Sequence, residues 1–261
     1  LNSEYLSNLN KNQKEAVECL DGPLLIVAGA GSGKTKVLTS RIAHIIKKNK
    51  AFPNQILAVT FTNKAAKEMQ LRVSKLLKKD ATGLPWLGTF HSISAKLLRK
   101  HADAVGLKSN FSIIDQDDQV RLIKNICKAE NVDIKKISPK FILAIIDKWK
   151  NKGFYPQDVI LKRKDPLEKN FLSIYKIYQE KLVNLNSADF SDLILHTLKI
   201  FEKYTDIAEL YSKKFKYILV DEYQDTNFIQ SEWLRHLSGH NKNICCVGDD
   251  DQSIYLSLIH I

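Results

Sequence analysis

Cysteine, methionine and long apolar runs are scarce in this sequence of 261 residues. The four cysteines show no CxxC spacing, so neither a disulfide framework nor a cysteine metal site is expected. Two of them, Cys245 and Cys246, lie in an apolar strand-like stretch, and we interpret the cysteines as small buried hydrophobes. No apolar run approaches the roughly 20 residues of a membrane helix, and Leu1–Glu4 open no basic-then-apolar targeting segment. We expect a reduced, cytoplasmic protein without a membrane partner.

Acidic residues are also in deficit. The chain has 40 Lys and Arg against 29 Asp and Glu, a formal net charge of +11 and a pI near 9.3. Such a balance favours an anionic partner, with nucleic acid the leading candidate. The alternative is lysine enrichment from biased base composition, which the many Lys, Asn and Ile residues also fit. The length allows one large domain or two smaller ones, and we favour two.

A glycine-rich loop stands between an apolar stretch at 24–28 and a helical pattern that begins near Val37. The loop reads Ala28, Gly29, Ala30, Gly31, Ser32, Gly33, Lys34 and Thr35. Glycines bring backbone N–H groups against phosphate oxygens, Lys34 supplies a positive charge and the Thr35 hydroxyl can hold Mg²⁺. Continuous apolar residues predict a strand buried on both faces. The strict motif has glycine at position 28, where this chain has alanine, and the alternative is a flexible turn followed by a chance lysine.

A second apolar strand, at 217–220, ends in two carboxylates, Asp221 and Glu222. Because ligands bind at the carboxyl ends of parallel strands, Asp221 can reach Mg²⁺ while Glu222 polarises the attacking water. The alternative is a solvated acidic turn. Paired with the glycine-rich loop, this strand predicts a P-loop ATPase that uses ATP and Mg²⁺.

Strand and helix signals alternate in the first third of the chain and again near its end. We predict strands at 56–61, 86–90, 217–220 and 244–247, with helices at 64–77 and from Ser92. From 111 to 185 the pattern is lysine-rich and helical, with no convincing strand. The sequence therefore predicts an α/β domain at 1–110 and 186–255 that is interrupted by a helical subdomain at 111–185.

Five further segments carry a family resemblance. They are Leu9–Gln13, Thr60–Ala66, Gly88–Ser92, Ser187–Leu193 and Val247–Tyr255. With the two motifs above, they resemble the UvrD/PcrA/Rep family of superfamily 1A DNA helicases over nearly the whole chain. The resemblance implies an α/β fold: a RecA-like P-loop NTPase domain 1A with a parallel sheet, interrupted by an all-helical, DNA-guiding 1B subdomain.

The resemblance also implies roles for individual residues. Gln13 and Lys36 would contact adenine, the loop from Ala28 to Thr35 the phosphates, and Gln252 the γ-phosphate. Lys34, Asp221, Glu222 and Gln252 would be catalytic, with Mg²⁺ held by Thr35 and Asp221. The residues implied in DNA binding are Phe61, Thr62, Asn63, Thr89, Phe90, His91 and Tyr255. Aromatic side chains stack on bases of any sequence, which suits an enzyme that must move along arbitrary DNA.

Simpler alternatives stand beside several of these roles. Gln13 fits an exposed residue at a helix start, Phe61 a core aromatic, His91 a structural histidine and Asp189 a helix cap. The family usually has arginine where this chain has Lys36, and lysine lacks the planar stacking surface. We therefore expect a modestly weaker preference for adenine nucleotides.

The implied activity is that of an ATP-dependent 3′–5′ DNA helicase that acts on single strands and on junctions of single with double strand, in repair or replication with accessory proteins. We expect the chain to be the N-terminal half of such an enzyme, nearly inactive alone. Residues 256–261 are expected to be non-native, encoded by a sequencing adapter read in frame. The alternatives are the motor subunit of a helicase-nuclease, or a module that binds single-stranded DNA in response to ATP without unwinding it.

Overall fold

A computed structural model describes residues 4–29, 31–78, 83–134, 136–161 and 166–249. The chain divides into two compact units, and two helices, α5 (Phe90–Lys100) and α11 (Phe228–Ser238), contribute residues to both. The first unit contains 1–93, 205–227 and 234–261, and the second contains 94–204 and 228–233. The second unit thus extends beyond the predicted 111–185 on both sides, and the assignment of subdomains 1A and 1B stays a proposal.

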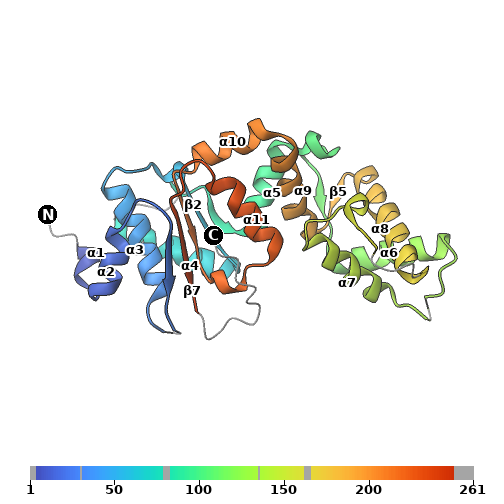
Figure 1. Ribbon diagram of the computed structural model, residues 1–261, viewed down its shortest axis with the longest axis horizontal. Coiled ribbons are helices and arrows are strands. Elements are labelled where there is room, and N and C mark those ends of the chain that lie inside the picture. Colours follow the sequence, from blue (N-terminus) through green and yellow to red (C-terminus); the bar gives the residue numbers. More distant parts are fainter. Residues whose placement is uncertain (1–3, 30, 79–82, 135, 162–165, 250–261) are drawn as a thin grey trace. The chain divides into compact units, whose positions relative to one another are not determined.

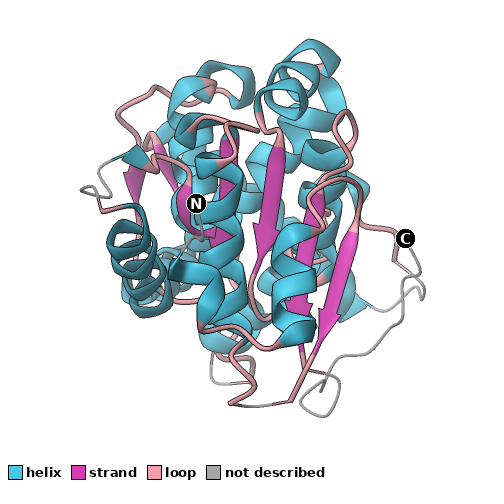
Figure 2. Ribbon diagram, turned by 90° about the vertical axis from the view of Figure 1, so that its left-hand side faces the viewer, coloured by secondary structure: helices cyan, strands magenta, loops and turns pink. Residues whose placement is uncertain are grey.

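A five-stranded, fully parallel sheet forms the centre of the first unit (Figure 2). The strand order is β1-β7-β6-β2-β3. The strands are β1 (Leu24–Val27), β2 (Ile56–Thr60), β3 (Leu87–Thr89), β6 (Tyr217–Val220) and β7 (Ile244–Gly248). Each of the five predicted strand regions is present. Because all five strands are parallel, their carboxyl ends meet at one edge of the sheet.

The other elements of the first unit are mostly helices (Figure 1). They are α1 (Glu4–Ser7), α2 (Lys11–Glu18), α3 (Lys34–Lys47), α4 (Asn63–Leu77), α10 (Thr205–Lys214) and the 3₁₀ turns η1 (Pro53–Gln55) and η5 (Tyr223–Asp225). The helix α3 packs against α2, α4 and β7, and α4 also contacts β2 and β3. Apolar side chains from these elements form the core, among them Leu38, Ile42, Ile45, Ile56, Met69, Val73, Leu219 and Val247.

The strand β1 corrects one prediction. Its continuous apolar residues predict burial on both faces, yet Leu25 is 62% exposed and Val27 is 54% exposed. Side chains alternate along the strand, so Leu24 and Ile26 pack against the core while Leu25 and Val27 lie on the opposite face, which the described residues leave uncovered. The central strands β2, β6 and β7 are buried on both faces, as a parallel sheet requires.

The second unit is mainly helical. Its elements are η3 (Ala102–Val105), β4 (Ser112–Ile113), α6 (Gln116–Ala129), α7 (Pro139–Lys150), η4 (Pro156–Asp158), α8 (Pro166–Asn184), β5 (Ser187–Ala188) and α9 (Phe190–Lys203). The predicted apolar stripes meet in its core, which includes Ile123, Ile126, Ile142, Ile146, Tyr175 and Tyr178. One feature was not predicted: the two-residue strand β4 pairs in parallel with β5, so the segment 111–185 is not wholly helical.

The cysteines are free thiols, and three of the four are buried as predicted. Cys19 is the exception, because it is exposed at the end of α2. Burial raises the pKa of the Cys245 thiol to about 11. Among the described helices, none combines the length and hydropathy needed to cross a membrane.

Candidate functional site

The glycine-rich loop joins β1 to α3 at the carboxyl edge of the sheet. Gly31 (φ +75°) and Gly33 (φ +88°) adopt the left-handed conformation that glycine takes without a steric penalty. A Cβ at Gly33 would lie 2.9 Å from Nε2 of Gln13. Ala28 is accommodated without the glycine of the strict motif, since its N–H donates to the Gly248 carbonyl at 3.1 Å and continues the pairing with β7. Ala30 lies outside the described residues.

Lys34 is the first residue of α3 and is 9% exposed. Its Nζ donates to the Ala28 carbonyl at 2.7 Å and lies 3.2 Å from Oδ2 of Asp249, which follows β7. The loop and the β7 end therefore hold the lysine over the sheet edge. Thr35 is half-buried and Lys36 is exposed, with its Nζ bonded to the Asn8 carbonyl. The N–H groups that begin α3 point toward the same loop, so the helix end favours an anion there.

Gln13 lies beside this loop, at the third position of α2. Asn10 and Gln13 form a capping box: the Asn10 side chain accepts from the Gln13 N–H at 2.9 Å, and Gln13 Oε1 accepts from the Asn10 N–H at 3.1 Å. Gln13 Nε2 also donates to the Ser32 carbonyl at 2.8 Å. An amide has two N–H donors and two lone pairs, so one donor and one acceptor of Gln13 are unused in these contacts.

The two carboxylates after β6 have different environments. Asp221 is 4% exposed, and its Oδ1 has no hydrogen-bond partner among the described residues. Burial and the charge of Glu222 raise the pKa of Asp221 to about 6. A buried, unpaired carboxylate oxygen fits a cation, and Mg²⁺ in such sites takes one or two carboxylates plus substrate phosphates. No cluster of three acidic, histidine or cysteine ligands exists in the described part of the chain.

Asp221→Asn is expected to stabilise the metal-free chain at pH 7.5 by about 2 kcal/mol, with almost no effect at pH 4. The pKa of Asp221 is raised in the folded state, so the wild type loses stability as the pH rises from about 4 through about 6. Asparagine cannot ionise and escapes this loss. Urea unfolding at both pH values without Mg²⁺ measures the difference. An equal change at the two pH values would contradict the assignment.

Glu222 adopts a left-handed conformation (φ +51°) that turns the chain into η5. Its Oε2 accepts from Gln224 Nε2 at 2.7 Å, and Gln224 Oε1 accepts from the Asp249 N–H at 3.0 Å. One glutamine amide therefore joins the acidic loops that follow β6 and β7. Gln224 and Asp249 were not among the predicted site residues. Asp249 carries the same signal as Asp221, an acid directly after an apolar strand, whereas the sequence has no comparable signal for Gln224.

The segments predicted to bind DNA follow β2 and β3 at the same sheet edge. Phe61 is half-buried, and its ring centroid lies 5.5 Å from that of Phe90. Phe90, also implied in DNA binding, is 1% exposed, so its side chain packs against Phe61 and only its backbone is left to meet DNA. Thr62 caps α4 through the Ala65 N–H, with Asn63 exposed beside it.

Thr89 and His91 lie where β3 meets α5. Thr89 Oγ1 accepts from the Ser92 N–H at 3.1 Å, and Ser92 Oγ accepts from the Thr89 N–H at 2.9 Å. These reciprocal bonds begin the helix, much as a capping box does. His91 is half-buried, and burial lowers its pKa to about 4, so the imidazole is neutral at pH 7. Gln252 and Tyr255, the remaining predicted residues, lie outside the described part.

The order of the strands sorts these residues along the edge: the glycine-rich loop on β1, Asp249 on β7, the carboxylates on β6, then Phe61 on β2 and Thr89 on β3. The model of the UvrD/REP helicase N-terminal domain matches residues 9–256, nearly the whole chain. The chain belongs to the UvrD/REP helicase family.

This UvrD/REP helicase domain is similar to longer proteins. It is 49% identical over 257 residues to the probable DNA helicase II homolog of Rickettsia conorii, covering 97% of this chain and 39% of that protein. It is 46% identical over 250 residues to the ATP-dependent DNA helicase PcrA of Staphylococcus epidermidis, covering 96% of this chain and 34% of that protein. The chain therefore spans two fifths or less of the length of these relatives.

The second unit of the UvrD/REP helicase domain holds a buried ion cluster. Lys150, at the end of α7, places its Nζ 2.6 Å from Asp189 Oδ2 and 2.7 Å from Asp192 Oδ1, and all three side chains are fully buried. Asp189 also caps α9 in a capping box with Asp192. The helix-cap interpretation of Asp189 is thus confirmed, with the ion pair as an added role.

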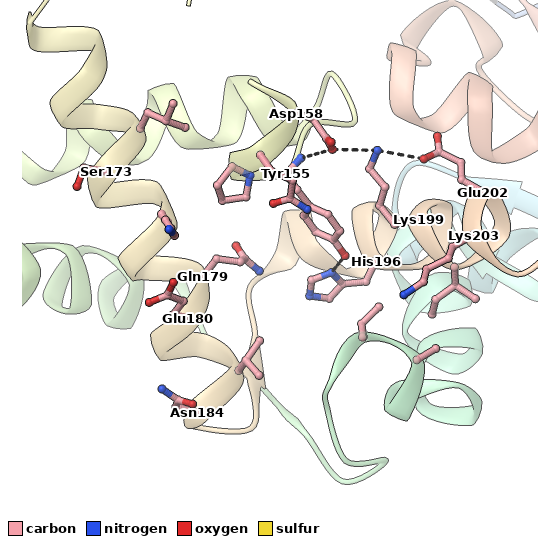
Figure 3. Close-up of a pocket in the computed structure, with 18 of the residues that line it drawn as sticks. Tyr155, Asp158, Ser173, Gln179, Glu180, Asn184, His196, Lys199, Glu202 and Lys203 are labelled. Atoms are coloured by element: carbon pink, nitrogen blue, oxygen red, sulfur yellow. Dashed lines mark hydrogen bonds and ion pairs between the residues drawn. The ribbon is translucent and has the colours of Figure 1, made fainter. Parts of the chain in front are cut away.

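A cavity of about 1220 Å³ lies in the same unit, lined by residues of η3, η4, α8 and α9 (Figure 3). Tyr155 bonds His196 Nδ1 at 2.5 Å, and Lys199 lies 3.1 Å from Asp158 and 3.0 Å from Glu202. None of the predicted ATP- or DNA-binding residues lines this cavity. It is distinct from the site at the sheet edge.

Proposed function

We propose that this chain supplies an ATP-binding domain of an ATP-dependent DNA helicase that moves 3′ to 5′ along single-stranded DNA. The observation that carries the proposal is the order along one sheet edge, where the glycine-rich loop, Asp249 and the two carboxylates follow β1, β7 and β6, and the segments predicted to bind DNA follow β2 and β3. Asp221 connects these two groups of strands directly, because its N–H donates to the Val59 carbonyl of β2 at 3.0 Å.

The loop and α3 would hold the phosphates of ATP. The left-handed conformations of Gly31 and Gly33 would allow backbone N–H groups of the loop to face an anion, and the start of α3 would add its dipole. Lys34 would leave Asp249 for the β- and γ-phosphates. Thr35 and Asp221 would hold Mg²⁺, which neutralises charge on the phosphates when bound.

Gln13 would read the adenine base. Its unused N–H matches the N7 acceptor of adenine, and its unused lone pair matches the N6 amino group. Guanine presents an acceptor at O6 in place of that donor, so the same amide pairs with it less well. Lys36 lacks the flat guanidinium that would stack on the base, and it contacts the Asn8 carbonyl instead.

Glu222 is the proposed general base. The Gln224 amide orients its carboxylate, and the same amide is bonded to the backbone after β7. Glu222 would accept a proton from the attacking water while Lys34 stays on the phosphates. The relatives are more than twice as long, and we infer that a second domain in such a protein contributes further cations to the γ-phosphate.

Phe61 is the proposed stacking residue for single-stranded DNA. Phe90 supports its ring from behind, and stacking on bases contributes about 1–3 kcal/mol per base without regard to sequence. The exposed Asn63 and the capped starts of α4 and α5 would face phosphates, with Thr62, Thr89 and neutral His91 at those starts. The second unit would be the 1B subdomain that guides DNA.

The test is binding and turnover by the chain itself. We expect Mg²⁺-dependent binding of ATP, and binding of a fluorescent oligothymidylate that weakens steeply with salt. Because we expect the chain to be nearly inactive alone, turnover near background fits both the proposal and the alternative of an ATP-responsive DNA-binding module, whereas turnover that the oligonucleotide stimulates would exclude that alternative. Failure to bind ATP would refute the proposal. Action at duplex junctions, accessory partners and a cytoplasmic location are parts of the proposal that require the longer protein in its cell.

Asp249→Asn is expected to raise the affinity for ATP about three- to tenfold. In the free site the Asp249 carboxylate competes with phosphate for Lys34, and its charge repels the triphosphate. The amide keeps the shape and removes the charge. Titration with a fluorescent ATP analogue measures the change, with Asp206→Asn on α10 as a surface control. A weaker affinity would mean that Asp249 assists binding instead of competing with it.

A further inference from the structure

Arg41 is a buried charge with no carboxylate partner among the described residues. It lies on α3 two turns after the phosphate loop and is 1% exposed. Its Nε also lacks a hydrogen-bond acceptor in the described structure. Burying a guanidinium in this way is costly, so its contacts indicate what it stabilises.

The guanidinium binds the C-terminal end of α2. Nη1 donates to the Ala16 carbonyl at 2.6 Å and also to the Cys19 carbonyl, and Nη2 donates to the Leu20 carbonyl at 3.4 Å. The last carbonyls of a helix have no partner within the helix and carry the negative end of its dipole. From α3, Arg41 donates hydrogen bonds to these carbonyls and places a positive charge at the negative end of the dipole.

The opposite end of α2 carries Gln13, which is bonded to the phosphate loop through the Ser32 carbonyl. The helix α2 has only eight residues, and an isolated helix of that length is marginal in water. Its position relative to α3 therefore depends on contacts with that helix. Arg41 donates charge-assisted hydrogen bonds to the C-terminal end of α2, the end distant from Gln13.

We propose that Arg41 is a positioning residue for base recognition. It fixes the C-terminal end of α2 on α3 and thereby holds the Gln13 amide where it meets the adenine edge. This inference rests on the proposed nucleotide site, and it adds a residue that touches neither base nor phosphate. Its effect should appear with ATP and be absent with a ligand that has phosphates but no base.

The experiment compares affinities for ATP, GTP and inorganic tripolyphosphate by competition with a fluorescent ATP analogue in Mg²⁺. Arg41→Gln is expected to weaken ATP binding about tenfold and to leave tripolyphosphate within about twofold, the size of one lost base hydrogen bond. Arg41→Lys should restore part of the affinity, because an ammonium group still donates to the carbonyls of α2. Arg121→Lys, at an exposed arginine of the second unit, is the control.

A double-mutant cycle separates this proposal from the proposed function. Gln13→Ala should lose at least as much affinity for ATP, and Gln13→Ala with Arg41→Gln should bind ATP no more weakly than Gln13→Ala alone. Two results would overturn the positioning role while the nucleotide site stands. In the first, Gln13→Ala weakens ATP binding and Arg41→Gln does not. In the second, Arg41→Gln weakens the binding of tripolyphosphate as much as that of ATP. If the wild type binds ATP no better than GTP and tripolyphosphate, base reading by Gln13 fails and the role of Arg41 fails with it. Should Arg41→Gln not fold, Arg41→Lys carries the same cycle with a loss of about threefold.

Discussion

Glu222→Gln is expected to bind ATP as tightly as the wild type and to hydrolyse it about 10² to 10⁴ times more slowly. Glutamine preserves the shape of the side chain and cannot accept a proton from water. Its Oε1 still accepts from Gln224 if the new amide is oriented suitably, so the link between the β6 and β7 loops is retained. The change thus separates the chemical step from binding.

Single-turnover hydrolysis of radiolabelled ATP measures this effect, since it detects slow rates with enzyme in excess. A chimera in which the chain replaces the matching region of Staphylococcus epidermidis PcrA allows the rate of ATP hydrolysis to be measured again with DNA present. Glu209→Gln, on the surface of α10, is the matched control and should leave both rates unchanged. Unchanged turnover in Glu222→Gln would remove this residue from the role of general base, and a parallel loss of ATP binding would make it a binding residue.

Lys150→Met should reduce the free energy of unfolding by about 3–5 kcal/mol. The substitution leaves Asp189 and Asp192 fully buried without their cation. Burial together with the Asp192 charge already raises the pKa of Asp189 above its usual value, even with Lys150 present. Without the lysine, the two carboxylates can share the site only if at least one takes up a proton.

Urea unfolding at pH 7.5 measures the loss, and Lys152→Met provides a control two residues away at an exposed position. The triple variant Lys150→Met, Asp189→Asn, Asp192→Asn should recover part of the stability, because asparagine still caps α9 and carries no charge. A loss below about 1 kcal/mol in Lys150→Met would mean that solvent reaches the cluster and screens it.

Local patterns in the sequence predict much of the sheet edge. Continuous apolar runs locate β2, β6 and β7, and the acids after β6 fall at the carboxyl end as expected. The positive φ values of Gly31 and Gly33 agree with the phosphate-loop interpretation. These features depend on neighbours a few residues apart, which is the range over which periodicity and turn chemistry act.

The features that were missed depend on contacts distant in the sequence. One face of β1 is exposed because the described elements cover only the face of Leu24 and Ile26, and a run of apolar residues does not encode which faces are covered. Phe90 is buried, and its ring contacts that of Phe61, 29 residues earlier in the sequence. Lys150 meets acids 39 and 42 residues away, and Arg41 meets carbonyls that have no side-chain signal at all. A single sequence contains no direct record of such pairings.

The hydrogen bond from the Asp221 N–H to the Val59 carbonyl has a mechanical consequence. Adjacent strands lie about 4.8 Å apart, and Val59 precedes Phe61 by only two residues. If binding of a cation displaces the Asp221 backbone by a fraction of an ångström, β2 must follow or lose that bond, and the Phe61 ring moves with it. Through this one hydrogen bond, a change at the Asp221 backbone would reach Phe61 without any rearrangement between β6 and β2.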